Sequence, residues 1–273
     1  MNWNTKIFAT LTVIAVCSLA LVIKANVAPG PKLVRKIVID AGHGGKDPGC
    51  HGQYSYEKDI ALDVAKKTGT MLKQKYGSGV EILYTRTYDV LAGGDHLSTK
   101  QSLQHRHKVA NDAKADLFVS VHINSSAKRV TTAKGTETYV LGLHRNEQKE
   151  GAIGEYSGNF SGGRGMLNPS DPTTAIIVAQ YSQAFLANSI LLGTKIEDQF
   201  TNAGRYSKGV KQKGLEVLAG SAMPGVLVEL GFLNNPAEES LLASDYGKTQ
   251  CANAIFKGIQ EYKAEVEGQV KQN

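Results

Sequence analysis

From residue 33 onward, short apolar runs alternate with longer segments in which apolar residues recur at helical intervals. The predicted strands lie at residues 34–40, 80–84, 116–123, 136–141, 215–218 and 225–230. The predicted helices lie at residues 57–77, 99–114, 174–200 and 237–266. In the first helix, for example, Ile60, Val64 and Leu72 fall on one face. Strands that alternate with helices indicate an α/β fold, with a mostly parallel sheet of about six strands flanked by helices.

The first 25 residues are predicted to lie outside this fold. Lys6 provides a basic flank, and residues 7–23 form an uncharged, mostly apolar run. This pattern is typical of a secretory signal peptide and predicts export to the periplasm, the cell envelope or the extracellular space. An uncleaved membrane anchor is the alternative, because the run approaches the length that spans a bilayer. Membrane contact is expected only through this segment.

The remaining chain has the size and composition of one globular domain. It follows a Pro/Gly linker at residues 26–33, occupies residues 34–263, and precedes a tail at residues 264–273. The full chain has 273 residues, 41% of them hydrophobic and 21% charged. Its formal charge of +6 falls to +4 without the N-terminal segment. Such a mild excess suits an anionic polymer nearby and is too weak to predict a nucleic-acid partner.

Four side chains that bind metals or protons are predicted to meet at one sheet edge. His43 follows the first strand in "IVIDAGHGG", and Glu57 begins the next helix. His122 ends the strand "DLFVSVH", and Glu229 ends "VLVEL". In an open α/β sheet the ligand crevice lies beyond the carboxyl ends of the strands. Two imidazoles and a carboxylate form a common catalytic zinc set with a position left for water. A second carboxylate can serve as general base.

Each of these residues also has an ordinary structural explanation. A lone histidine after a strand is often a hydrogen-bonded loop residue, and a glutamate at a helix start is stabilised by the helix dipole. Glu229 is harder to explain in this way, since an unpaired carboxylate among apolar neighbours would be costly to bury. Surface or hydrogen-bonded roles are expected for the other histidines of the domain, His51, His96, His105, His107 and His144.

Seven motifs in order along the chain point to one family. They are "IVIDAGHGGKDPG", "EKDIALDVAKK", "LYTRTYD", "RHKVANDAKADLFVSVHINSS", "GTETYVL", "GVKQKGLEVL" and "MPGVLVELGFLNNPAEESLL". With them, the chain resembles the zinc-dependent N-acetylmuramoyl-L-alanine amidases of the family-3 type, which hydrolyse bacterial peptidoglycan. The resemblance implies a twisted sheet, zinc ligands at His43, Glu57 and His122, and a catalytic glutamate at Glu229.

The implied reaction separates the glycan strand of peptidoglycan from its stem peptide. Water bound to Zn²⁺ attacks the lactyl carbonyl of N-acetylmuramic acid, and Glu229 accepts a proton and then delivers it to the amine of L-alanine. Two alternatives stay open: another exported zinc hydrolase, such as a peptidase or deacetylase, and a catalytically inactive peptidoglycan-binding module. The resemblance implies peptidoglycan as the partner, and a protein activator stays open.

Two features depart from the family pattern or stay open. Cys50 stands where a small residue is common, and export would permit a disulfide with Cys251, although two free thiols fit equally well. Residues 145–172 are rich in glycine and are expected to form a loop instead of a helix. We expect this loop to border the zinc cleft. Some family members place an autoinhibitory helix near this point, which a loop would not reproduce.

Overall fold

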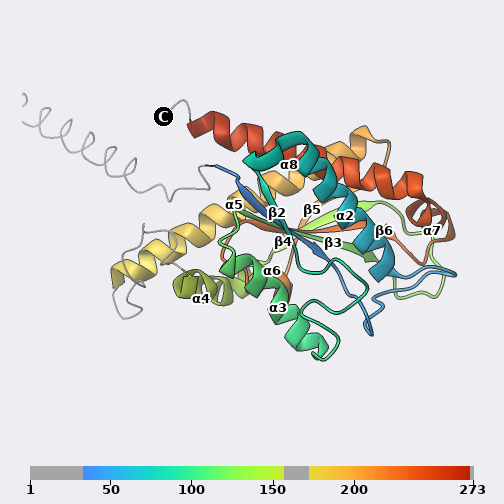
Figure 1. Ribbon diagram of the computed structural model, residues 1–273, viewed down its shortest axis with the longest axis horizontal. Coiled ribbons are helices and arrows are strands. Elements are labelled where there is room, and N and C mark those ends of the chain that lie inside the picture. The colour runs from blue at the N-terminus through green and yellow to red at the C-terminus, as the bar shows by residue number, and fades with distance from the viewer. Residues whose placement is uncertain (1–32, 157–171, 271–273) are drawn as a thin grey trace, which may run out of the picture.

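A mixed sheet of six strands crosses the centre of the described chain (Figure 1). The computed structural model describes residues 33–156 and 172–270. The strands are β1 Lys36–Ala41, β2 Glu81–Tyr84, β3 Leu117–Asn124, β4 Thr136–Leu141, β5 Ser207–Lys213 and β6 Gly225–Phe232, in the spatial order β2-β1-β3-β6-β4-β5. Only the β4–β6 pair is antiparallel among these neighbours. The predicted α/β class and mostly parallel sheet are therefore confirmed, while the expected signal peptide lies outside the described residues.

Helices cover both faces of the sheet (Figure 1). They are α2 Glu57–Tyr76, α3 Thr99–Asp112, α4 Asn146–Tyr156, α5 Pro172–Asn202, α6 Glu216–Ala219, α7 Pro236–Ala243 and α8 Asp245–Val270, with short 3-10 turns η1 Gly77–Gly79 and η2 Leu143–Arg145. Side chains alternate between the faces along each strand. Ile37 and Ile39 of β1 pack into the core beneath α2, α5 and α8, whereas Val38 packs into the core beneath α3 and α6.

One predicted strand is wrong, and the strand that replaces it lies just before it. Residues 215–218 were expected to be extended, but the helix α6 begins at Glu216, and Val217 and Leu218 are buried against the sheet. The strand is instead β5, whose sequence SKGVKQK contains a single large apolar residue. Because β5 is an edge strand with mostly exposed or half-buried side chains, it lacks the apolar signal of an interior strand.

The glycine-rich segment also differs from expectation, because its first part is the helix α4. Ile153 of α4 is fully buried against Val178 and Phe185 of α5. Lys149 is buried as well, and its Nζ donates to the carbonyl oxygen of Met223 at 2.7 Å and to Ser221 Oγ at 3.1 Å. Tertiary packing of this kind outweighs the low helix propensity of two glycines. The second part of the segment lies outside the described residues.

The core explains part of the apolar composition of α5. By length and composition this helix could cross a membrane. Its C-terminal half packs against α8, β4 and β5, however, and Leu192, Ile196 and Phe200 are fully buried there. The helix predicted at residues 237–266 is instead two helices, α7 and α8, which are separated at Ser244. The second helix, α8, ends at Val270, so the first residues of the predicted tail at 264–273 are helical.

A buried ion pair fixes the end of β1, where the sequence places its first candidate ligand. Asp40 is fully buried, and its carboxylate accepts from Arg106 Nη1 at 2.5 Å, Ser120 Oγ at 2.6 Å and Thr85 Oγ1 at 2.5 Å. Burial by itself would raise the pKa of Asp40. The charge of Arg106 and the two hydroxyl groups outweigh that effect and lower the pKa below its usual value.

Two arginines then hold the backbone that follows Asp40. Arg106 donates to the carbonyl oxygens of Ala41 and His43 at 2.6 and 2.7 Å. Arg86 donates to the carbonyl oxygens of Ala41 and Gly42 at 3.0 and 2.7 Å. Carbonyls that leave a strand end would otherwise lack partners in this buried region. The guanidinium groups therefore position the loop that carries His43.

Replacing Arg106 with methionine should lower the free energy of unfolding by about 3–5 kcal/mol, because Asp40 would remain as an uncompensated buried charge. Chemical denaturation of the purified variant measures this loss. Lys108→Met is the matched control on the same helix, since Lys108 forms an exposed pair with Asp112 that is worth about 0–1 kcal/mol. Equal stability losses in the two variants would contradict the assigned role of Arg106.

Candidate metal centre and catalytic cleft

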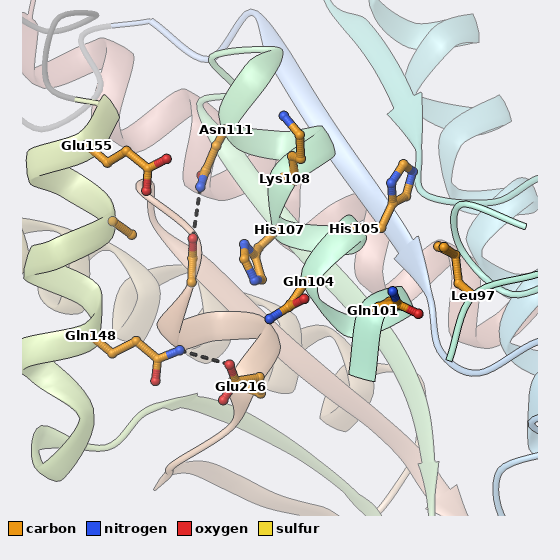
Figure 2. A pocket seen from close by; sticks show the side chains of 12 residues that line it. Leu97, Gln101, Gln104, His105, His107, Lys108, Asn111, Gln148, Glu155 and Glu216 are labelled. Atoms are coloured by element: carbon orange, nitrogen blue, oxygen red, sulfur yellow. Dashed lines mark hydrogen bonds between the residues drawn. The ribbon is translucent and has the colours of Figure 1, made fainter. Parts of the chain in front are cut away.

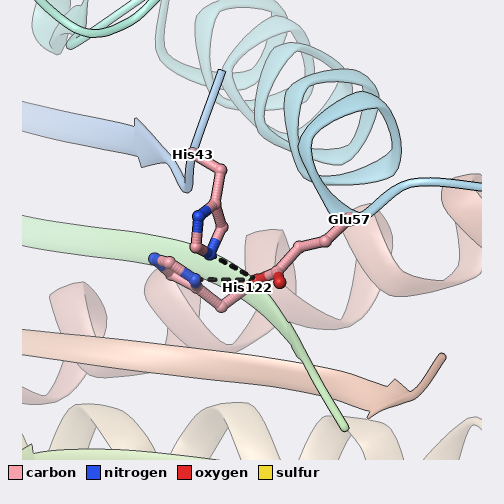
Figure 3. A group of neighbouring side chains, drawn as sticks. All are labelled: His43, Glu57 and His122. Carbon is pink, nitrogen blue, oxygen red and sulfur yellow. Dashed lines mark hydrogen bonds and ion pairs between the residues drawn. The ribbon is translucent and has the colours of Figure 1, made fainter. Parts of the chain in front are cut away.

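His43, Glu57 and His122 converge at the carboxyl ends of β1 and β3 and at the start of α2 (Figure 3). The three potential ligand atoms lie within 4.8 Å of one another. His43 Nε2 lies 3.2 Å and His122 Nδ1 lies 2.9 Å from Glu57 Oε1. The two imidazole rings meet edge to face, with centroids 4.9 Å apart. The structure thus brings together the three ligands expected from the sequence, in a group that could hold a metal ion.

The glycines near His43 are required by the close approach of these side chains. A Cβ atom on Gly42 would lie 2.4 Å from the ring of His122. A Cβ atom on Gly49 would lie 2.5 Å from Glu57 Oε2, and Gly49 also has a φ of +68°. His43 itself adopts a φ of +56°, which is uncommon for a residue with a side chain. Missing Cβ atoms therefore create the space in which the ligands meet.

The carboxylate of Glu57 is held in place from behind by backbone groups. Its Oε1 accepts from the backbone N–H of Ile123 at 3.0 Å, and its Oε2 accepts from the N–H of Cys50 at 2.8 Å. Burial raises the pKa of Glu57, but hydrogen bonds from His122 and His43 outweigh it and hold the pKa well below its usual value. Glu57 is thus an ionised, oriented carboxylate.

Asp47 orients His43 in a similar way. Its Oδ2 lies 2.9 Å from His43 Nδ1, so that the other ring nitrogen, Nε2, faces Glu57. A carboxylate behind a ligating histidine fixes the tautomer and the ring direction. Sequence reasoning did not single out Asp47, although it lies only four residues after His43 within the first motif.

Glu229 lies beside the three ligands on the neighbouring strand. It is directly opposite His122 in the β3–β6 register, and its Oε2 is buried without a hydrogen-bond partner among the described residues. Burial and the negative charge of Glu57 raise the pKa of Glu229 to about 8. A buried carboxylate without a partner is costly, and such groups concentrate at functional sites.

A further carboxylate, Glu137, lies opposite Glu229 on β4. Unlike Glu229, it is fully engaged: it accepts from Asn124, from Lys211 and from the Tyr139 hydroxyl, the last at 2.9 Å. These contacts outweigh burial and lower the pKa of Glu137. Sequence reasoning missed this residue, because its neighbour β5, which supplies Lys211, was not recognised as a strand.

A separate groove of about 550 Å³ lies between α3, α4 and α6 (Figure 2). His107 lines it from α3 and is half-buried, and burial lowers its pKa. At one end of this groove, Gln148 of α4 donates a hydrogen bond to Glu216 Oε1 at 2.9 Å. The described part of the glycine-rich segment therefore borders this groove. A distinct cavity of about 110 Å³ is lined by His43 and His122, and no residue of α4 lines it. Among the described residues, the segment 145–172 therefore does not border the metal cleft, contrary to expectation.

The remaining candidate residues lie apart from the metal centre or carry no metal-binding role. In the described chain, the metal-binding group contains no histidine other than His43 and His122. Cys50 and Cys251 are free thiols, which resolves the alternative left by the sequence. Cys50 Sγ donates to the carbonyl oxygen of Ile123 at 3.1 Å, and burial raises the pKa of its thiol. Cys50 thus packs behind Glu57 as a protonated thiol.

Relatives of known sequence resemble most of the chain. An uncharacterized protein, YqiI, from Bacillus subtilis is 31% identical over 251 residues, which cover 91% of this chain and 95% of YqiI. The N-acetylmuramoyl-L-alanine amidase AmiC from Neisseria meningitidis is 30% identical over 83% of this chain and 52% of AmiC. The chain therefore spans about half the length of that named amidase.

Solved structures and a family model agree with these relatives. The catalytic domain of CwlV, an N-acetylmuramoyl-L-alanine amidase from Bacillus (Paenibacillus) polymyxa, is 30% identical, with a TM-score of 0.59 over 84% of this chain and 97% of that domain. An N-acetylmuramoyl-L-alanine amidase from Clostridium difficile is 26% identical, with a TM-score of 0.59 over 84% of this chain and 96% of that one. The model of the N-acetylmuramoyl-L-alanine amidase family matches residues 37–261. The chain belongs to the N-acetylmuramoyl-L-alanine amidase family.

Proposed function

We propose that this protein hydrolyses the amide bond between N-acetylmuramic acid and L-alanine in peptidoglycan, with Zn²⁺ held by His43, Glu57 and His122. The observation that carries the proposal is the convergence of these three ligand atoms beside Glu229, whose buried oxygen lacks a partner among the described residues. Membership of the amidase family supports the choice of substrate and bond.

The donor set and its spacing fit zinc. Two neutral imidazoles and one carboxylate are a common set in catalytic zinc sites. Zinc bonds of about 2.0–2.1 Å in a tetrahedron place neighbouring ligand atoms about 3.3 Å apart. The two distances to Glu57 Oε1, 3.2 and 2.9 Å, are close to that value. Bound there, zinc would polarise the lactyl carbonyl and activate a water molecule.

The protein's own groups would handle the proton and hold the geometry. Glu229 accepts a proton from the attacking water and delivers it to the leaving amine of L-alanine, which then departs as a neutral group. Its pKa is raised by burial and by Glu57, which suits a residue that must hold a proton between the two steps. Asp47 keeps His43 Nε2 directed at the centre during the reaction.

The family's substrate assigns the protein to the cell envelope. We propose that residues 1–25 direct export, as a cleaved signal peptide or a retained anchor, and that residues 34–263 form the catalytic domain. We also propose Glu229 as the catalytic residue, since it is the carboxylate opposite His122 that keeps an oxygen without a hydrogen-bond partner among the described residues.

Purified peptidoglycan incubated with the protein should release stem peptides with a free L-alanine amino group, and a chelator should abolish the release. Mass spectrometry of the soluble products measures both. Products cut within the peptide, or loss of acetyl groups alone, would identify a different zinc hydrolase. Binding to peptidoglycan without any release after zinc addition would identify an inactive binding module.

The two glutamates should respond differently to substitution by glutamine. Glu57→Gln should lower zinc occupancy, as should His43→Ala and His122→Ala, because each removes one of the three protein ligands. Glu229→Gln should retain zinc and lose about 10²–10⁴-fold in turnover, because an amide cannot accept the proton. Metal analysis and kinetics of each purified variant measure the difference. Loss of zinc from Glu229→Gln together with an active Glu57→Gln would reverse the two roles.

Zinc affinity should fall as the pH is lowered below about 8. Burial lowers the pKa of His43, but hydrogen bonds and charge from Glu57 and Asp47 outweigh it and raise the pKa to about 8. Only the neutral imidazole binds zinc, so a proton competes with the metal below that pH, by about tenfold for each pH unit. Chelator competition between pH 6.5 and 8.5 measures this slope. Asp47→Asn should weaken binding by about 10–100-fold and flatten the slope, whereas an affinity independent of pH would contradict the account.

A further inference from the structure

A row of polar side chains extends from the metal centre across the sheet. His122 of β3, Glu229 of β6 and Glu137 of β4 are directly opposite one another in the two registers. Residues that pair in this way project from the same face of a sheet. Tyr139, two residues after Glu137, projects from that face too, and its hydroxyl donates to Glu137. The row therefore forms a continuous floor that leads from the metal ligands toward the edge strand β5.

Three lysines of β5 border this floor, and they differ in their partners. Lys208 and Lys211 both pair with Glu137. Lys213 is exposed, and its ammonium lies 4.8 Å from the centroid of the Tyr139 ring. It forms no ion pair with an acidic residue in the described part of the chain. The charge of Lys213 also lowers the pKa of Glu229, but burial raises that pKa by more.

We propose that Lys213 binds a carboxylate of the stem peptide, namely the free carboxylate on the residue that follows L-alanine. This inference rests on the proposed amidase function. An exposed ammonium held over an aromatic ring, without a carboxylate of the described residues to neutralise it, is suited to receive an anion from the substrate. The negative groups of the floor do not compete for it, since Glu137 is already engaged by two other lysines.

The spacing of the strands agrees with the length of the substrate. Neighbouring strands lie about 4.8 Å apart, so that β5, which carries Lys213, lies about 14 Å from β3 and its metal ligand, and β4, whose Tyr139 ring the Lys213 ammonium contacts, lies about 10 Å from β3. An extended peptide advances about 3.5 Å per residue, which places a group on the second residue about 7 Å from the scissile amide. The flexible four-carbon side chain of Lys213 can cover the difference. The stem peptide would then lie across the strands, over Glu137 and Tyr139.

The test compares two soluble disaccharide-tripeptides. In one, the second residue is γ-linked D-glutamate with a free α-carboxylate, and in the other this group is the amide. Lys213→Gln should raise KM for the free acid by about fivefold to tenfold, the worth of one partly exposed ion pair. Any change in kcat that arises from the effect of Lys213 on Glu229 should be the same for the two substrates. The KM for the amide should stay within about twofold. Lys213→Arg should retain the preference for the acid, and Lys213→Glu should reverse it.

Lys257→Gln is the matched control, because it removes the same charge from an exposed position on α8, on the opposite face of the sheet. It should leave both KM values unchanged. If the wild-type protein cleaves both substrates and Lys213→Gln changes the two KM values equally, this inference is overturned. The proposed amidase function is unaffected by that result. Wild-type protein with zinc that cleaves neither soluble substrates nor intact peptidoglycan would overturn the proposed function itself, and this inference with it.

Discussion

The buried ion pair between Asp40 and Arg106 is the interaction on which the metal centre depends. Asp40 follows the apolar residues of β1 and is fully buried, and an isolated charge in the core would be very costly. Arg106 neutralises it and, with Arg86, also binds the carbonyl oxygens that follow. The strained residue His43 can keep its positive φ because these contacts over-determine the loop around it. Electrostatics in the core thus positions a ligand at the surface.

A second constraint is the placement of three carboxylates around one centre in three different environments. Glu57 is held ionised by two histidines and two backbone N–H groups. Glu137 is held ionised by lysines, a tyrosine and an asparagine. Glu229 lies next to both and keeps a buried oxygen without a partner in the described chain, so its pKa alone is raised. Neighbours of like charge and burial together raise the pKa of the residue that we propose as the proton acceptor.

The sequence predicts where the interior strands β1, β3 and β6 end. The apolar runs of β1, β3 and β6 are unambiguous because these interior strands are buried on both faces, and a polar residue at the end of such a run is conspicuous. Since parallel strands end at one edge, His43, His122 and Glu229 could be assigned to one site without coordinates. The same logic fails for Asp47 and Glu137, whose roles depend on which side chains lie next to them.

The sequence by itself determined the α/β class, the three metal-binding side chains and the neighbouring glutamate, because burial on both sheet faces leaves a strong local pattern. Tertiary structure alone decided the helix α4, the edge strand β5 and the partners of each carboxylate. Glycines in α4 and lysines in β5 oppose the local signal, and both elements form because of contacts with residues distant in the chain, such as Ile153 with Phe185 and Lys211 with Glu137. Local propensity is worth less than about 1 kcal/mol per residue, and burial of one large apolar side chain exceeds it.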